Sequence, residues 1–345
     1  MSSLSFLLLY QTLYILQKIF IFCLFYLFYN KRAIMHEERR GKMFDVLITS
    51  LTFILIIVIA YFLKRVKVLK KSDANILATI IMNVTLPCAL LTSANGITLD
   101  MTILILIAVG ILSNVIMILV GYGFAYKERP VIKGTYMINV SGYNIGNFVL
   151  PFVQSFFSGM GVVYLCSFDI GNALMGLGIT YALADHVASG QSDFHLKDVL
   201  KKLFSSIPFD VYLLIFIMAI FQIEFPSYIL SMATTIGAGN SFLAMMMIGL
   251  MLEIKVSHSE AYHVVKIIVL RIVGTLILSG IIFIVLPLPL LAKEILTMAL
   301  CAPLSTVSAV FSQKIGYSGD MPATANSLSI IISIVCMITL LLIFI

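Results

Sequence analysis

The stretch that decides the fold is NVSGYNIGNFVLPFVQSFF, residues 139–157, which lies inside a long apolar run but carries two glycines, three asparagines and a proline. Pro151 lacks a backbone N–H and its ring crowds the carbonyl four residues earlier, while each glycine costs about 1 kcal/mol relative to alanine in a helix interior. Hydrocarbon tolerates such an interruption only where protein or a water-filled cavity satisfies the freed backbone groups. The stretch therefore predicts a membrane helix that is broken at a tight helix contact or at a binding site.

A second apolar run is interrupted in the same way near the end of the chain. It reads LTMALCAPLSTVSAVFSQKIG, residues 296–316, and places Pro303 among serines and threonines. Interrupted hydrophobic segments at corresponding places in two halves of a chain indicate a transporter binding site. The second break therefore favours the binding-site interpretation of the first.

Composition excludes a soluble protein. The chain has 345 residues, 61% hydrophobic and 11% charged, with a mean hydropathy of +1.09, whereas a soluble globular domain is roughly 25% charged. The net charge of +6 does not indicate a nucleic-acid partner, because the basic residues lie in short strips between apolar runs. The five cysteines have no CxxC spacing, and no catalytic motif is present, so neither a metal nor a cofactor nor an enzymatic activity is expected. We predict an all-α polytopic membrane protein in contact with the lipid bilayer.

Apolar runs near the ~20 residues that cross a bilayer divide the chain into one run at 4–29 and ten further spans. The ten predicted spans are 44–63, 74–94, 101–124, 132–157, 160–183, 207–223, 227–252, 263–286, 290–313 and 321–345. The fourth span of each group of five is the broken one. The predicted domains are a first repeat at 43–183, a cytoplasmic loop at 184–206 and a second repeat at 207–345.

The two groups of five spans share a layout. Aligning Asn144 with Leu304 gives an offset of 304 − 144 = 160, and the same offset places Asp169 of the fifth span on Ser329 of the tenth. Basic residues gather in the loops that follow odd-numbered spans: Lys64, Arg65, Lys67, Lys70, Lys71, Lys127, Arg129, Lys133, Lys197, Lys201, Lys202, Lys255, Lys266 and Lys314. By the positive-inside rule these loops are cytoplasmic, and an odd number of helices per half makes the two halves inverted in the membrane.

Residues 1–42 do not fit this topology. A helix at 4–29 would leave the basic residues between 31 and 42 on the outer face, against the positive-inside rule. We treat 1–42 as an extra hydrophobic N-terminal segment and expect the native protein to start at Met43, since HEERRGK before it can be encoded by a purine-rich run similar to a bacterial ribosome-binding site. The alternative is an eleventh helix.

Residues 43–345 resemble the auxin efflux carrier family of membrane transport proteins, which includes plant auxin carriers and bacterial permeases for malate-like or malonate-like acids. The motifs that carry the resemblance are GYNIGNFVLP (142–151), FDIGN (168–172), GNSFLAMMMIGLMLE (239–253), APLSTVSAVF (302–311) and ANSLS (325–329). The resemblance implies two inverted five-helix repeats whose broken helices four and nine cross at the substrate site, as in bile-acid symporters and sodium/proton antiporters. It places the crossover asparagine on Asn144 and the crossover proline on Pro303. Plant carriers have proline where this chain has Tyr143, and many have a longer cytoplasmic loop, so the resemblance favours a bacterial permease.

The predicted substrate site lies at the two breaks. It comprises Asn144, Asn147, Pro303, Ser305 and Thr306. The asparagines offer both donors and acceptors at the break, and we expect a substrate carboxylate between Asn144 and the backbone following Pro303. The alternative for the two hydroxyl residues is ordinary helix packing, in which small side chains also serve.

Ion coupling is assigned to Asp169 and Asn172 of the fifth span. A carboxylate inside a membrane is costly and is functional by default, so Asp169 could carry a proton or sodium. Its alternative is a structural hydrogen bond to the frayed backbone of a broken helix. Arg271 is expected to snorkel along the eighth span rather than to bind an anion.

The resulting hypothesis is a secondary transporter or permease for a small organic anion, such as malate, malonate or an auxin-like acid. We expect it in the plasma membrane, as a multi-pass protein of a bacterial inner membrane. The alternative is a membrane-embedded ligand sensor that keeps a transporter fold, since fold alone does not determine function. The anion, the direction of transport, the coupling ion and the oligomeric state, a homodimer included, stay open.

Overall fold

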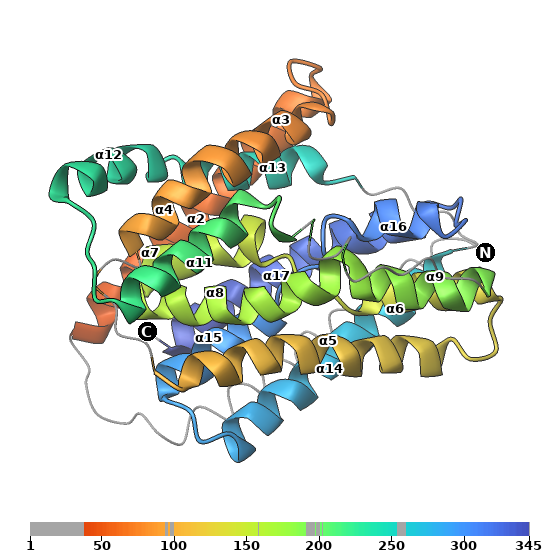
Figure 1. Cartoon of the computed structure of the whole chain (residues 1–345). Helices are drawn as coiled ribbons and strands as arrows, with labels where there is room; N and C mark the ends of the chain where they lie inside the picture. The colour runs from red at the N-terminus through yellow and green to blue at the C-terminus, as the bar shows by residue number, and fades with distance from the viewer. Residues whose placement is uncertain are drawn as a thin grey trace.

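The computed structural model describes residues 38–93, 96, 100–157, 159–190, 197, 201, 203–253 and 260–344 (Figure 1). The predicted apolar run at 4–29 lies outside these residues. Helix α2 begins at Glu38 and its candidate membrane span at Phe44, and the start of the native protein at Met43 stays a prediction.

The described residues form helices and connecting segments, with no strand among them. The helices of the first half are α2 (Glu38–Arg65), α3 (Asp73–Ile80), α4 (Leu86–Ser93), α5 (Thr102–Phe124), α6 (Pro130–Val140), α7 (Leu150–Phe156), α8 (Gly159–Leu174) and α9 (Thr180–Ser189). Three π-helical turns continue the helices beside them: η1 (Ile81–Thr85), η2 (Ile145–Val149) and η3 (Met175–Ile179). The helices of the second half are α11 (Ile207–Ile220), α12 (Ser227–Gly237), α13 (Asn240–Met251), α14 (Ala261–Val285), α15 (Leu290–Leu300), α16 (Ser308–Lys314) and α17 (Met321–Phe344).

Six helical stretches in the described part of the chain are long and apolar enough to cross a membrane. They are Phe44–Arg65, Asp73–Ser93, Thr102–Phe124, Ser227–Met251, Ala261–Val285 and Met321–Phe344. Each coincides with a predicted span to within a few residues, and α8 and α11 are shorter apolar helices at two more. The protein is thus a polytopic helical membrane protein.

The helices pack in two groups. In the smaller helix group, α2 and α3 contact α13 while α4 contacts α11 and α12; in the larger helix group, α5 contacts α6 and α8, and α14 contacts α15 and α17. Figure 1 shows the smaller group tilted across the larger one. The packing of the first half recurs in the second half. The pair α5 and α8 corresponds to the pair α14 and α17, and the pair α5 and α6 corresponds to the pair α14 and α15.

Two glycines bring α5 and α8 into backbone contact. A Cβ added to Gly110 would lie 2.3 Å from the carbonyl oxygen of Phe168, and one added to Gly171 would lie 2.2 Å from that of Ile107. Small residues at a helix contact permit this approach, which lets dispersion contacts hold two membrane helices together. The contact sets the distance between Asn114 of α5 and Asn172 of α8.

The first helix break lies earlier than Pro151. Helix α6 ends at Val140, the chain is extended or turned over residues 141–144, and the helix resumes with η2 at Ile145. Gly142 has φ +73°, a left-handed conformation that glycine adopts without strain. The prediction that Pro151 interrupts the helix is wrong, because Pro151 is the second residue of α7 directly after the π turn, where the wider ladder and the early position tolerate the missing N–H.

Candidate functional site

The two helix breaks touch each other. The backbone N–H of Asn144 donates to the carbonyl oxygen of Pro303 at 3.1 Å. A Cβ added to Gly142 would lie 3.3 Å from the Cβ of Ser305, so the glycine lets the two extended segments pass in van der Waals contact. The crossing expected between the fourth and ninth spans is therefore present as a direct backbone contact between two residues 303 − 144 = 159 positions apart.

A cavity of about 200 Å³ lies beside this crossing. Six of the seven predicted site residues line it: Asn144, Asn147, Asp169, Asn172, Ser305 and Thr306. Pro303 is not among the lining residues and contributes its backbone carbonyl to the crossing instead. Residues of both breaks, of α8, of η1 and of α11 form the wall, so the cavity lies where the larger helix group faces the smaller one.

The two crossover asparagines keep unused hydrogen-bonding capacity. The side-chain Oδ1 of Asn147 is buried without a hydrogen-bond partner. The side chain of Asn144, which directly precedes the helix that resumes at Ile145, forms no capping hydrogen bond to that helix, although the residue is only 7% exposed. An unsatisfied buried polar group costs about 1–3 kcal/mol, so both side chains are suited to a ligand in the cavity.

Asn172 holds the backbone of the first break. Its Oδ1 accepts from the N–H of Tyr143 at 3.2 Å, and its Nδ2 donates to the carbonyl of the same residue at 2.9 Å. Asn114 completes the arrangement, because its Oδ1 accepts from the N–H of Gly142 at 2.9 Å and its Nδ2 donates to Oδ1 of Asn172 at 3.2 Å. Asn172 therefore lines the cavity and also holds the backbone of the first break.

The carboxylate of Asp169 lies in the cavity wall between two neutral donors. Asn172 Nδ2 donates to its Oδ1 at 2.9 Å, and the hydroxyl of Tyr212 donates to its Oδ2 at 3.3 Å. Both donors are side chains, so the link of this carboxylate to the first break runs through Asn172, and the choice between a structural and an ion-coupling role stays a prediction. A carboxylate held by neutral groups at a cavity can take up a cation there without first breaking an ion pair.

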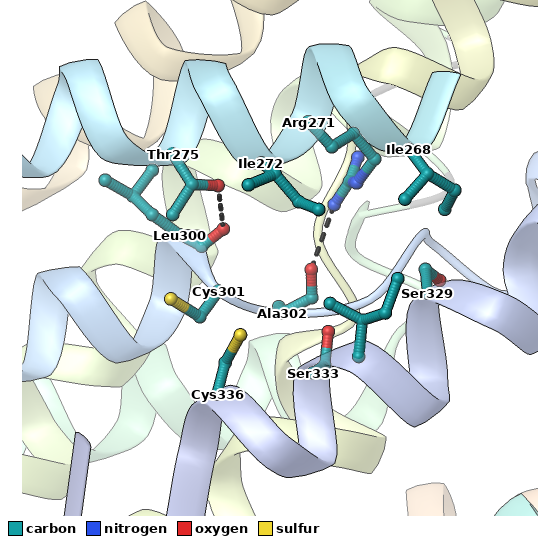
Figure 2. A pocket seen from close by; sticks show the side chains of 11 residues that line it. Ile268, Arg271, Ile272, Thr275, Leu300, Cys301, Ala302, Ser329, Ser333 and Cys336 are labelled. Atoms are coloured by element: carbon teal, nitrogen blue, oxygen red, sulfur yellow. Dashed lines mark hydrogen bonds between the residues drawn. The ribbon is translucent and has the colours of Figure 1, made fainter. Parts of the chain in front are cut away.

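Arg271 does not snorkel. Its side chain is buried, with 6% exposed, and its Nη1 donates to the carbonyls of Val140, Ser141 and Gly142 at 2.9–3.0 Å. Its Nη2 donates to the carbonyl of Ala302 at 3.0 Å, as Figure 2 shows. The carbonyls freed at the ends of α6 and α15 accept hydrogen bonds from the guanidinium inside the protein, in place of the water that it would reach at the membrane surface. The residue lines a separate small cavity of about 30 Å³ and is not among the lining residues of the 200 Å³ cavity.

Several residues of the cavity wall are not predicted from the sequence. They are Met82 and Leu86 near η1, and Ser206, Pro208, Phe209 and Tyr212 at the start of α11. Tyr212, and Asn114 beside the first break, could have been identified because each is a polar residue inside an apolar run, and buried polar groups in a membrane need partners. Nothing in the sequence pattern of Met82 or Phe209 distinguishes them from lipid-facing residues.

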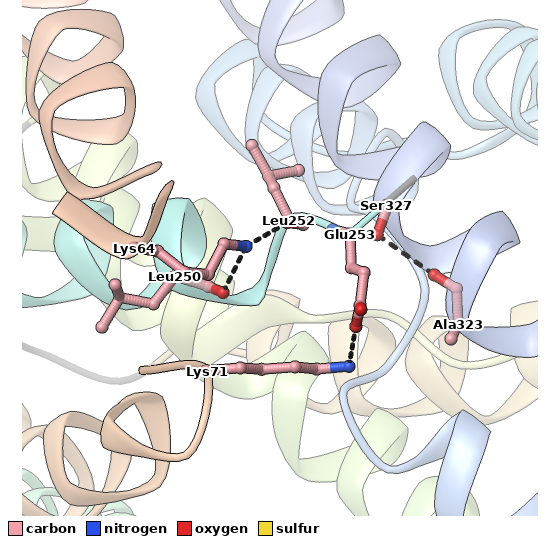
Figure 3. Close-up of polar contacts among 7 residues, drawn as sticks. All are labelled: Lys64, Lys71, Leu250, Leu252, Glu253, Ala323 and Ser327. Carbon is pink, nitrogen blue, oxygen red and sulfur yellow. Dashed lines mark hydrogen bonds and ion pairs between the residues drawn. The ribbon is translucent and has the colours of Figure 1, made fainter. Parts of the chain in front are cut away.

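A polar cluster joins the two helix groups at the predicted cytoplasmic ends of α2 and α13 (Figure 3). Lys64 Nζ donates to the carbonyls of Leu250 and Leu252, and Lys71 forms an ion pair with Glu253. The N–H of Glu253 donates to the hydroxyl of Ser327 on α17 at 3.0 Å. The end of α13 is thereby tied to α17 of the larger helix group.

Residues 45–192 match the model of a protein family described as "Membrane transport protein". The match supports the resemblance to auxin efflux carriers over this range, which holds the first break, Asp169 and Asn172 but ends before the second break. It covers less than half of the chain, and it says nothing of malate or malonate. A comparison with curated proteins finds no match.

Proposed function

We propose that the protein is a secondary active transporter for a small organic anion and that the cavity at the crossing of the two broken helices is its substrate site. The observation that carries the proposal is the cavity itself, whose wall combines Asn147 with an unpartnered Oδ1, Asn144 with a side chain that caps no helix, and the carboxylate of Asp169. Transporter sites built from discontinuous helices have this character. The membrane would be the inner membrane of a bacterium.

The proposed architecture is ten spans in two inverted repeats. The recurring packing pairs support it, and so does a second correspondence between the halves. Asn172 binds the backbone of Tyr143 at the first break, and Ser329 of α17 accepts from the N–H of Leu304 at the second break at 3.1 Å. A polar residue of the span that follows each broken helix thus holds the break, as a repeated design requires.

The wall favours an anion bound without a side-chain cation. Among the described lining residues none carries a positive charge. The helix that resumes at Ile145 begins at the cavity, and the first turn of a helix offers free N–H groups and roughly +0.5 of partial charge. The side-chain amide of Asn144 can donate to the same carboxylate. These groups suit a small carboxylate such as malonate or malate.

Asp169 makes a coupling cation part of the proposal. Its negative charge would repel a carboxylate bound in the same cavity, because charges a few ångströms apart interact strongly where water is scarce. A proton or a sodium ion bound at Asp169 removes that repulsion. The anion and the cation would then bind together and cross together, which couples uptake to the ion gradient.

Two measurements on the purified full chain test the proposal. A thermal-shift screen of mono- and dicarboxylates identifies the ligand, since a ligand of the folded state raises its apparent stability. Uptake of that acid into proteoliposomes then separates transport from sensing. Binding without accumulation would support a sensor. If no acid of the screen is bound or taken up, the proposal is refuted.

The matched variants are Asn144→Ala and Gln154→Ala. A hydrogen bond to a charged group is worth about 1.5–3 kcal/mol, so loss of the Asn144 amide should weaken binding roughly 10- to 100-fold. Gln154 pairs with Asn240 and does not line the cavity, so its variant should bind as the parent does. Equal binding by both variants would exclude Asn144 from the site.

A further inference from the structure

The ends of two half-helices converge on one side chain. Helix α6 ends at Val140 and helix α15 at Leu300, and each leaves its last carbonyls without partners inside its own helix. Arg271 of α14 donates to three carbonyls at the end of α6 and to that of Ala302 just beyond α15. One turn further along α14, Thr275 donates to the carbonyl of Leu300 at 2.9 Å. Figure 2 shows both bonds reaching from α14 to the second break.

The charge of Arg271 is balanced by these helix ends. Each carbonyl end of a helix carries roughly −0.5 of partial charge, so two of them together offset about one guanidinium charge. The ring of Tyr143 also lies 5.3 Å from the guanidinium carbon, in reach of a cation–π contact. The guanidinium is therefore accommodated at the crossing by groups of the crossing itself.

We propose that Arg271 is a positioning residue that holds both breaks in register, so that the amino end of the helix at Ile145, Asn144 and the second break face one cavity. The planar guanidinium suits this role, because its donors point in fixed directions toward two separate segments. A lysine ammonium is a compact charge on a flexible stem and cannot keep both in place. The consequence for anion binding rests on the proposed function, while the bridging of the breaks does not.

The first test is amide hydrogen exchange of the full chain in detergent, read at residues 139–147 and 299–307. Arg271→Lys and the neutral Arg271→Gln should each raise exchange about tenfold or more in both segments, since hydrogen bonds to a charged group are lost at both. Asn114→Ala should raise it only in the first segment. Ser279→Ala is the control, because this serine is buried on α14 and its hydroxyl has no hydrogen-bond partner among the described residues. Unchanged exchange in the second segment of both Arg271 variants overturns the proposal.

The second test is binding of malonate, as the probe, to the Arg271 variants at a temperature at which thermal unfolding shows them to be folded. Arg271→Lys keeps the charge, so a purely electrostatic role predicts parental affinity, whereas loss of positioning predicts about tenfold weaker binding or more. Faster exchange with parental malonate affinity would reduce Arg271 to a structural role and overturn its positioning role. If the parent binds neither malonate nor any acid of the screen, the proposed function fails, and the bridging of the breaks is decided by exchange alone.

Discussion

Replacement of Gly110 by alanine should destabilise the protein by forcing α5 and α8 apart. The added Cβ would lie 2.3 Å from the carbonyl oxygen of Phe168, whereas ordinary contact begins at 3.4 Å, so the helices must separate by about 1 Å. Overpacking of this kind costs about 1–3 kcal/mol, and the gain in helix propensity returns at most about 1 kcal/mol. The separation would also stretch the 3.2 Å bond between Asn114 and Asn172 past the range of a hydrogen bond.

The matched control is Gly123→Ala on the same helix, where an added Cβ meets nothing within 4 Å. Thermal unfolding in detergent should place Gly110→Ala several degrees below the parent, at about 2–4 °C per kcal/mol, and Gly123→Ala at or slightly above it. Gly110→Ala should also bind the identified acid more weakly. Equal melting temperatures for the two variants would refute the close contact of α5 and α8.

Asp169→Asn should leave a folded protein whose transport in proteoliposomes no longer responds to the ion gradient. If uptake by this variant depends on the gradient as it does in the parent, coupling at Asp169 is excluded. Asn172→Ala removes both bonds to the backbone of Tyr143, each worth about 1 kcal/mol, so calorimetry should find binding roughly tenfold weaker or more, and parental affinity would contradict the role of Asn172 at the break. Lys71→Met should change the melting temperature little, because an exposed ion pair contributes about 0–1 kcal/mol; a large drop would mean that the pair with Glu253 is more than a surface contact.

Much of the fold could be predicted because a membrane helix is recognisable from a local run of apolar residues. A run of ~20 apolar residues has few ways to satisfy its backbone in hydrocarbon other than a helix, which is why six of the ten predicted spans agree with long apolar helices within a few residues. The positions of the helix breaks were harder to predict from the sequence. Proline suggested an interruption at Pro151, but the π turn before it absorbs the missing N–H, and the chain leaves the helix at Ser141 instead.

The candidate site was partly predictable for the same reason. Polar residues inside apolar runs are few, and this contrast indicated Asn144, Asn147 and Asp169, with the family resemblance also pointing to Asn144. Their partners were not. Tyr212 reaches Asp169 from 43 residues away, and whether a given tyrosine faces lipid or a carboxylate depends on how α11 packs against α8.

The sequence by itself determined that this is a helical membrane protein, where its helices lie, and that two of them are interrupted, because hydrophobic length and backbone chemistry act over one or two turns. The family resemblance implied that the two breaks cross, and only the tertiary structure showed which atoms touch there, which residues line the cavity, and that Arg271 faces inward. The last point has a simple physical cause. The direction of an arginine side chain in a membrane depends on which acceptors are nearest. Here they are the carbonyls of Val140 to Gly142, at least 129 residues from Arg271 in the sequence, and the carbonyl of Ala302, 31 residues from it.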